Sequence, residues 1–210
     1  LGVFILWFGW FGFNPGSTVS GMDSSIGFIA VTTNLAAAAG GVVTMFVTWI
    51  KYKKPDVSMT LNGVLAGLVA ITAGCASVSL WGAVAIGAIA GLAVVFAVEF
   101  IEKVLKVDDP VGAVAVHGVC GGLGTVLVGL FAVDGGLFYG GGLSLLGVQA
   151  LGVAAVGAWT MGTSFILFKA LKKFNGLWVD AEHEVAGLDI KEHGSEAYGD
   201  FQLKTMEVGK

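Results

Sequence analysis

Arginine is absent from the 210-residue sequence, and all 11 basic residues are lysines. Because these few lysines cannot form a basic face, we expect no nucleic-acid partner. Charged residues make up only 12% of the chain, whereas a soluble domain normally carries about a quarter. A mean hydropathy of +0.86 agrees with this scarcity of charge. The composition therefore indicates a membrane protein.

Cysteine and histidine are also scarce, with 2 and 3 residues respectively. Cys75 and Cys120 form no CxxC pair and lie in apolar surroundings, so we expect packing residues, with no disulfide and no zinc site. A bis-histidine haem needs two histidines within the membrane, but only His117 lies in an apolar segment. Phosphate-binding and nucleophile motifs are missing too. We expect no cofactor, no metal and no enzymatic activity.

Apolar runs fill most of the sequence. The first, residues 1–13, would cover about 20 Å as a helix, less than the roughly 30 Å of a bilayer core. We therefore expect it to be the last part of a transmembrane helix, in a chain that is a fragment. The other runs are residues 24–50, 57–77, 80–105, 111–133 and 143–172.

The predicted fold is therefore an all-α, polytopic membrane helix bundle with about six transmembrane segments within residues 1–174. A polar tail, residues 175–210, follows it. Lysines gather at alternate ends of the apolar runs, which places these ends and the tail in the cytoplasm by the positive-inside rule. They are Lys51, Lys53, Lys54, Lys103, Lys106, Lys169, Lys172 and Lys173.

Three pairs of small residues lie inside the predicted helices, at the spacing that lets neighbouring helix backbones approach closely. The pairs are Gly63-xxx-Gly67, Gly87-xxx-Gly91 and Gly118-xxx-Gly122. Together they indicate a tightly packed bundle.

The stretch DDPVGAVAVHGVCGGLG, residues 108–124, places a histidine in an apolar run. His117 lies about 10 Å of helix rise beyond Pro110, inside the hydrocarbon. An ionisable side chain there is costly and a functional candidate by default; the alternative is a packing residue satisfied by a neighbouring helix. We expect a neutral imidazole that both donates and accepts hydrogen bonds. Asp108 and Asp109 are predicted to cap the helix start, with Pro110 in its first turn.

The stretch FGWFGFNPGST, residues 8–18, joins aromatic rings to a polar turn. Trp10 and Phe13 precede Asn14 and the hydroxyl of Ser17. Two interpretations stay open on these residues alone. The rings are either an aromatic belt at the membrane surface, or part of a cation-attracting mouth with the hydroxyl as acceptor.

Other transport chemistries fit less well. A proton pump would usually carry carboxylates within the membrane, whereas Glu99 and Glu102 lie near a lysine-rich helix end, where they can reach water. An aquaporin-type channel would want two Asn-Pro motifs and typically an arginine, and this sequence has one such motif and no arginine.

Three stretches together resemble the ammonium transporter (Amt/Mep/Rh) family: FGWFGFNPGS, VDDPVGAVAVHGVCGGLG and, in the tail, GLDIKEHGSEAYGD. The resemblance covers essentially the whole chain. It implies a subunit of eleven transmembrane helices with an internal inverted repeat, and a homotrimer with one pore in each subunit. The predicted segments then resemble helices six to eleven, the C-terminal half.

By this resemblance, Phe13 is similar to the inner of two stacked aromatic gate residues. Ser17 resembles the hydroxyl that helps bind ammonium at the outer mouth, and His117 the second of two paired pore histidines. Trp10 and Asn14 belong to the same motif as Phe13, and we expect them to support it. The partner histidine and the outer gate belong to the first repeat, so this chain is expected not to conduct alone.

The resemblance therefore implies transport of ammonium or ammonia through a hydrophobic, histidine-lined pore in a lipid bilayer. It also implies docking of the tail on neighbouring subunits, and a possible PII-type signal protein at the cytoplasmic face. Two rival functions are a non-conducting membrane scaffold subunit and another small-solute channel.

Overall fold

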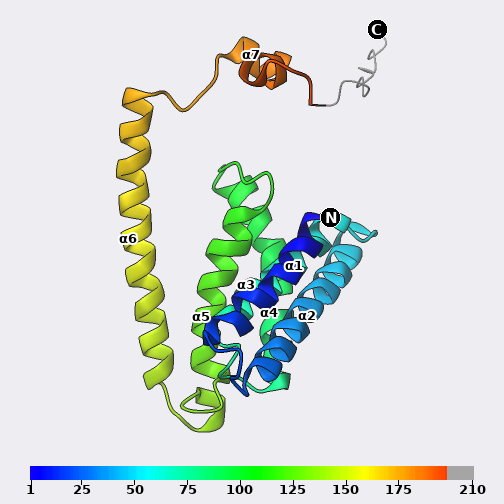
Figure 1. The fold of residues 1–210 in the computed structure, drawn as a ribbon, viewed down its shortest axis with the longest axis vertical. Helices are drawn as coiled ribbons and strands as arrows, with labels where there is room; N and C mark the ends of the chain where they lie inside the picture. Colours follow the sequence, from blue (N-terminus) through cyan, green and yellow to red (C-terminus); the bar gives the residue numbers. More distant parts are fainter. Residues whose placement is uncertain (198–210) are drawn as a thin grey trace. The chain divides into compact units, whose positions relative to one another are not determined.

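The computed structural model describes residues 1–197, and the end of the predicted tail, residues 198–210, lies outside the described residues. The chain divides into two units, residues 1–157 and 158–210, and each is described by itself. The described residues form helices (Figure 1), with one isolated β-bridge between Val78 and Ala132 and no strand. The predicted all-α class is confirmed.

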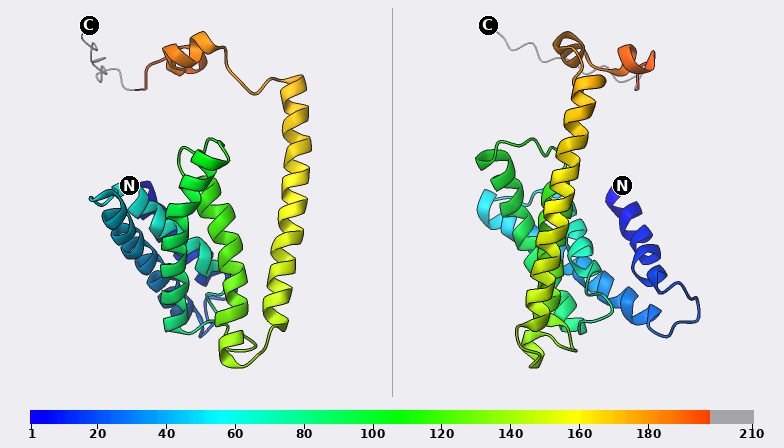
Figure 2. Two further views of the ribbon diagram at one scale, coloured as in Figure 1. Left: turned by 180° about the vertical axis from the view of Figure 1, so that it is seen from behind. Right: turned by 90° about the vertical axis from the view of Figure 1, so that its left-hand side faces the viewer.

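The first unit holds the packed helices (Figure 2). In chain order its elements are α1 (Gly2–Phe13), the 3₁₀ turn η1 (Pro15–Thr18), α2 (Ile26–Tyr52), α3 (Val57–Thr72), α4 (Leu80–Glu99), the π-helical turns η2 (Phe100–Val104) and η3 (Val114–Val119), α5 (Cys120–Phe131), the 3₁₀ turn η4 (Leu137–Tyr139) and the first part of α6 (Ser144–Phe174).

The second unit continues α6 and carries two short helical elements, α7 (Ala181–Ala186) and the π-helical turn η5 (Asp189–His193). α6 ends at Phe174 with Lys172 and Lys173 in its last turn, where cations suit the negative end of the helix dipole. After η5, the Asp189 carboxylate accepts a hydrogen bond from the backbone N–H of Ala197 at 2.9 Å.

Four helical stretches of the described residues are long and apolar enough to cross a membrane: Ile26–Tyr52, Leu80–Val104, Val114–Phe131 and Ser144–Phe174. α1, with 12 residues, and α3, with 16, are shorter. α3 ends before the predicted boundary at residue 77 because the chain turns there. The backbone N–H of Gly74 donates to Ile71 O at 2.9 Å, and that of Val78 donates to Gly74 O at 3.1 Å.

Small residues let α2 approach α3 and α4 at backbone distance. A Cβ added at Gly40 of α2 would lie 3.2 Å from the Cα of Gly67 on α3. One added at Gly91 on α4 would lie 2.9 Å from the Cα of Gly40. Two of the three predicted small-residue pairs therefore pack on α2. The third does not pack in this way, because Gly118 is exposed and a Cβ there would meet only Val114 of its own turn.

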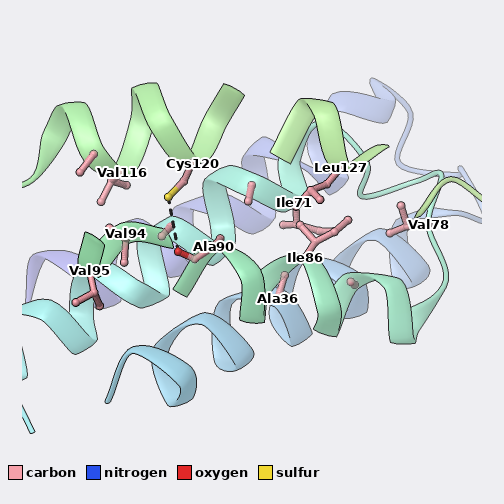
Figure 3. Close-up of a cluster of buried hydrophobic side chains, with 14 of the residues drawn as sticks. Ala36, Ile71, Val78, Ile86, Ala90, Val94, Val95, Val116, Cys120 and Leu127 are labelled. Carbon is pink, nitrogen blue, oxygen red and sulfur yellow. Dashed lines mark hydrogen bonds between the residues drawn. The ribbon is translucent and has the colours of Figure 1, made fainter. Parts of the chain in front are cut away.

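The buried apolar core extends from this contact to α5 and η3. Figure 3 shows Cys120 between Ala90 and Val116, with its thiol donating to the Ala90 carbonyl oxygen at 3.7 Å. Ile86 of α4 and Ile71 of α3 are fully buried in the same cluster. Cys120 therefore joins α5 to α4 as a packing residue.

Glu99 ties together the lysine-rich ends of α2 and α4. Its carboxylate accepts hydrogen bonds from Lys51, from Lys103 at 3.0 Å and from the Tyr52 hydroxyl at 2.8 Å. The side chain is 21% exposed. Glu99 therefore lies at the lysine-rich end, as expected, and there it also binds two ammonium groups and a phenol.

Two helices leave apolar faces without partners among the described residues. α1 has no buried residue, and its Phe4, Ile5 and Phe8 side chains are 64%, 63% and 82% exposed. α6 has no buried residue either, although its start contacts α5, where a Cβ added at Gly129 would collide with the Cα of Leu146. The buried core of the first unit therefore comes from α2 to α5, and Val3, Trp7 and Trp10 of α1 pack against it.

We expect Gly91→Val to destabilise the bundle, because its branched side chain would collide with the backbone of α2 at Gly40. Overpacking of this kind costs about 1–3 kcal/mol. Thermal unfolding of the detergent-solubilised protein measures the effect. Gly152→Val is the matched control, since nothing lies within 4 Å of a Cβ added there. Equal melting temperatures for the two variants would contradict the packing argument.

Candidate functional site

The C-terminal end of α1 is held against α3 by Trp10. Its indole N–H donates to the Thr72 hydroxyl oxygen at 3.0 Å. The Trp10 ring also meets the Phe13 ring edge-on, with centroids 5.7 Å apart and an interplanar angle of 78°. A groove of about 490 Å³ beside these rings is lined by Ile5, Leu6, Gly9, Trp10 and Phe13. The aromatic motif therefore forms one apolar surface, with Phe13 57% exposed.

Asn14 connects the same helix end to α2. Its side-chain amide donates to the Thr33 hydroxyl oxygen at 3.1 Å, and Asn14 is only 4% exposed. α1 ends here because the next residue is Pro15, which has no N–H to continue the helix. The chain therefore leaves α1 at Asn14, whose side-chain amide is buried.

Ser17 lies just beyond this turn, in η1, and is exposed. Its hydroxyl donates to the carbonyl oxygen of Phe13. A hydroxyl whose proton is used in this way still has lone pairs with which to accept a hydrogen bond. Ser17 is therefore tied to the backbone of Phe13, and both residues lie at one end of α1.

His117 lies on the π-helical turn η3, immediately before α5. Ala115, Val116 and Cys120 of this segment are buried in the core, whereas His117 is exposed. Within residues 1–197 the structure records no hydrogen bond from its imidazole. The core takes the opposite side of η3, and His117 occupies the side that the described residues leave open.

Asp109 anchors the turn that carries His117. Its two carboxylate oxygens accept hydrogen bonds from the backbone N–H groups of Val114 and Ala115, each at 3.1 Å, and it is 4% exposed. These N–H groups begin a helix and have no partner within it. The Asp109 carboxylate therefore stabilises an uncommon backbone geometry around His117. π-Helical turns of this kind often occur at functional positions.

The start of this helix differs from the prediction at two residues. Pro110 lies in a turn before the helix, which begins at Val114, so it is not in the first helical turn. Gly112 makes this turn possible with a φ of +68°. Asp108 is exposed, and in the described part of the chain its side chain bonds to no helix N–H. The acid that bonds to the helix is Asp109.

The site residues thus fall on two parts of the chain. Trp10, Phe13, Asn14 and Ser17 share the end of α1, whereas His117 sits on η3; both α1 and η3 pack against α3. The threonines that hold Trp10 and Asn14 were not predicted. Among residues 1–197, no group of three or more His, Cys, Asp or Glu side chains could hold a metal ion.

Comparison with known proteins identifies relatives of one kind. The sequence profile of the Ammonium Transporter Family matches residues 1–198. The chain is similar to ammonium transporter Amt2 of Archaeoglobus fulgidus, with 48% identity over 99% of this chain and 47% of that protein. It is also 38% identical to ammonium transporter 1 member 1 of Arabidopsis thaliana, over 94% of this chain and 44% of that protein.

Solved structures agree. A sensor Amt protein superposes with a TM-score of 0.85 and 44% identity, over 91% of this chain and 48% of that one. Candida albicans Mep2 superposes with a TM-score of 0.80 and 32% identity, over 87% of this chain and 42% of that one. The chain spans about half the length of the curated relatives it matches.

Replacing Asp109 by alanine is expected to lower stability, because the backbone N–H groups of Val114 and Ala115 at the start of η3 lose their acceptor. Loss of a helix cap costs about 0.5–2 kcal/mol. Asp108→Ala is the neighbouring control and should change stability by less than about 0.5 kcal/mol, as exposed substitutions usually do. Thermal unfolding compares the two variants, and the prediction is wrong if Asp109→Ala melts no earlier than Asp108→Ala.

Proposed function

The chain belongs to the ammonium transporter family, and from this premise we propose that it is the C-terminal half of a subunit that conducts ammonium or ammonia across a membrane. The observation that carries the proposal is the placement of His117. Its imidazole, which makes no hydrogen bond to residues 1–197, stands on the open side of an apolar span, on a turn fixed by a buried carboxylate.

The end of α1 supplies the chemistry for selecting the cation. The exposed ring of Phe13 offers a π face, which attracts a cation. The oxygen of Ser17 accepts a hydrogen bond from an N–H group. Alkali ions have no such group to donate, so this pair favours ammonium over ions of similar size.

Ammonium loses its proton before it passes further, because a bare cation is costly in an apolar conduit. Neutral ammonia both donates and accepts hydrogen bonds, and a neutral imidazole offers one donor and one acceptor in return. His117 therefore lines the path of ammonia and lowers its cost of desolvation. The paired histidine and the outer aromatic gate come from the N-terminal half of the subunit.

We further assign residues 1–174 to the membrane and residues 175–210 to a cytoplasmic tail. Four apolar spans and the lysines at alternate helix ends support this topology. In the full subunit the uncovered faces of α1 and α6 meet further helices or lipid. We assign the full-length protein to a homotrimer in which the tail contacts neighbouring subunits and is open to a PII-type signal protein.

In the full-length subunit, His117→Ala is expected to lower the rate of methylammonium uptake by at least about tenfold, the change that follows from an interaction of about 1.4 kcal/mol. Radiolabelled uptake measures the rate, and size-exclusion chromatography checks that the oligomer still assembles. His193→Ala, at an exposed position in η5, is the control and should transport normally. Unchanged rate and selectivity in His117→Ala would overturn the proposed role.

Ser17→Leu in the full-length subunit is expected to weaken uptake most at low methylammonium concentration, because it removes an acceptor that recruits the cation. A lost hydrogen bond to a charged group corresponds to a rise in KM of roughly tenfold. Uptake across a concentration series gives KM and the maximal rate separately. Ser24→Leu, at another exposed position of the same loop, serves as the control. An equal loss at every concentration would argue against recruitment at Ser17.

A further inference from the structure

Two threonine hydroxyls hold the residues on either side of Phe13. Trp10, one helical turn before Phe13, donates its indole N–H to Thr72 of α3 at 3.0 Å. Asn14, the residue after Phe13, donates its amide to Thr33 of α2 at 3.1 Å. The two acceptors lie on different helices, so the two bonds approach α1 from different directions.

The Thr72 bond has a defined direction. The Thr72 hydroxyl donates its own proton to the carbonyl oxygen of Leu68 at 2.7 Å, which leaves its oxygen as the acceptor for Trp10. Leu68 is fully buried. The indole is therefore fixed to the backbone of α3 through one hydroxyl. Because the Trp10 and Phe13 rings meet edge-on, with centroids 5.7 Å apart, the fixed indole also restrains the Phe13 ring.

The Thr33 bond is more deeply buried. Thr33 is 0% exposed and Asn14 is 4% exposed. A buried amide that lost this acceptor would leave a donor unsatisfied, which is costly away from water. Asn14, directly after Phe13, is therefore held by a hydrogen bond, as the Trp10 ring before Phe13 is.

Apolar packing seats one face of α1 on α2 and α3, whose Ala37, Val64 and Leu68 contact three half-buried residues of α1: Val3, Trp7 and Trp10. Phe13 lies beyond this contact and is 57% exposed, so burial in the core does not set the direction of its ring. A hydrogen bond, by contrast, has a strict geometry. The two threonine bonds consequently fix the end of α1 from which the Phe13 ring extends.

We infer that Thr72 and Thr33 are positioning residues, which fix the C-terminal end of α1 and hold the Phe13 ring across the transport path. The inference rests on the proposed function. Neither threonine contacts the substrate; each acts through the residue that it binds. By holding Phe13 in place, the two hydroxyls let its aromatic face meet a small ammonium-type cation.

The test uses the full-length transporter and separates binding from rate. Thr72→Val keeps the shape of the side chain and removes the acceptor, so Phe13 is displaced. We expect the KM for methylammonium to rise about five- to tenfold, as for one lost hydrogen bond. The maximal rate should stay within about twofold, because His117 is untouched. Thr72→Ser keeps the hydroxyl and should restore a near-normal KM.

Two further variants control for a folding defect. Thr163→Val makes the same substitution where the described residues show the hydroxyl bonding only within its own helix, to Trp159 O at 2.8 Å and Thr160 O at 3.2 Å, and it should transport normally. Trp10→Phe removes the donor but leaves the Thr72–Leu68 bond intact. It should raise KM as Thr72→Val does, even if Thr72→Val fails to reach the membrane.

The outcomes are distinguishable. If the unaltered transporter takes up no methylammonium, the proposed function itself fails. If it transports, and Trp10→Phe or a well-expressed Thr72→Val keeps a normal KM, the positioning role is overturned. A Thr72→Ser variant as impaired as Thr72→Val also overturns it, because the side-chain volume and not the hydroxyl would then matter.

Discussion

The contact of α2 with two helices at once, through Gly40, is the constraint on which the rest of the bundle depends. A helix pair can approach to this distance only where a surface lacks large side chains, and Gly67 and Gly91 meet Gly40 from two different partner helices. In a membrane, lipid tails compete with any apolar side chain, so close backbone packing gives much of the specificity. α3 and α4 are thereby fixed on α2, and α5 with η3 is fixed on α3 and α4.

Threonine supplies most of the polar contacts that such a close-packed interior can accommodate. Thr44 on α2 donates to the carbonyl oxygen of Gly91 at 2.7 Å, beside the close backbone contact of Gly91 with Gly40. Thr32 donates to Cys75 O at 2.7 Å and holds the turn after α3. A short side chain that can bond to a neighbouring helix fits where a longer polar group would not. Threonines also contact the end of α1, where Thr33 and Thr72 hold Asn14 and Trp10 in position.

Much of the fold could be predicted from the sequence, because apolar runs of sufficient length and glycine spacing are local signals. α2, α4 and α6 lie within a few residues of their predicted ranges. The predictions at the start of η3 were less accurate. Nothing in the local pattern distinguishes a π-helical turn from an α-helical one, and the choice of Asp109 over Asp108 depends on a positive φ at Gly112. Thr33 and Thr72 were missed because their partners are distant in sequence and ordinary helix residues in appearance.

The geometry of the π-helical turn η3 depends on how many residues the segment contains, more than on which side chains they carry. Such a turn accommodates one more residue than an α-helical turn, and each residue of an α-helix rotates the chain by about 100°. A single deletion between Ala113 and Cys120 would let the segment relax to an ordinary helix. The chain before it would keep its phase with α5, because the π-helical turn is where the extra residue is accommodated. The turn itself would change, and with it the arrangement in which Ala115 and Val116 face the core while His117 is exposed. The extra residue therefore helps to set the side of η3 that the imidazole occupies.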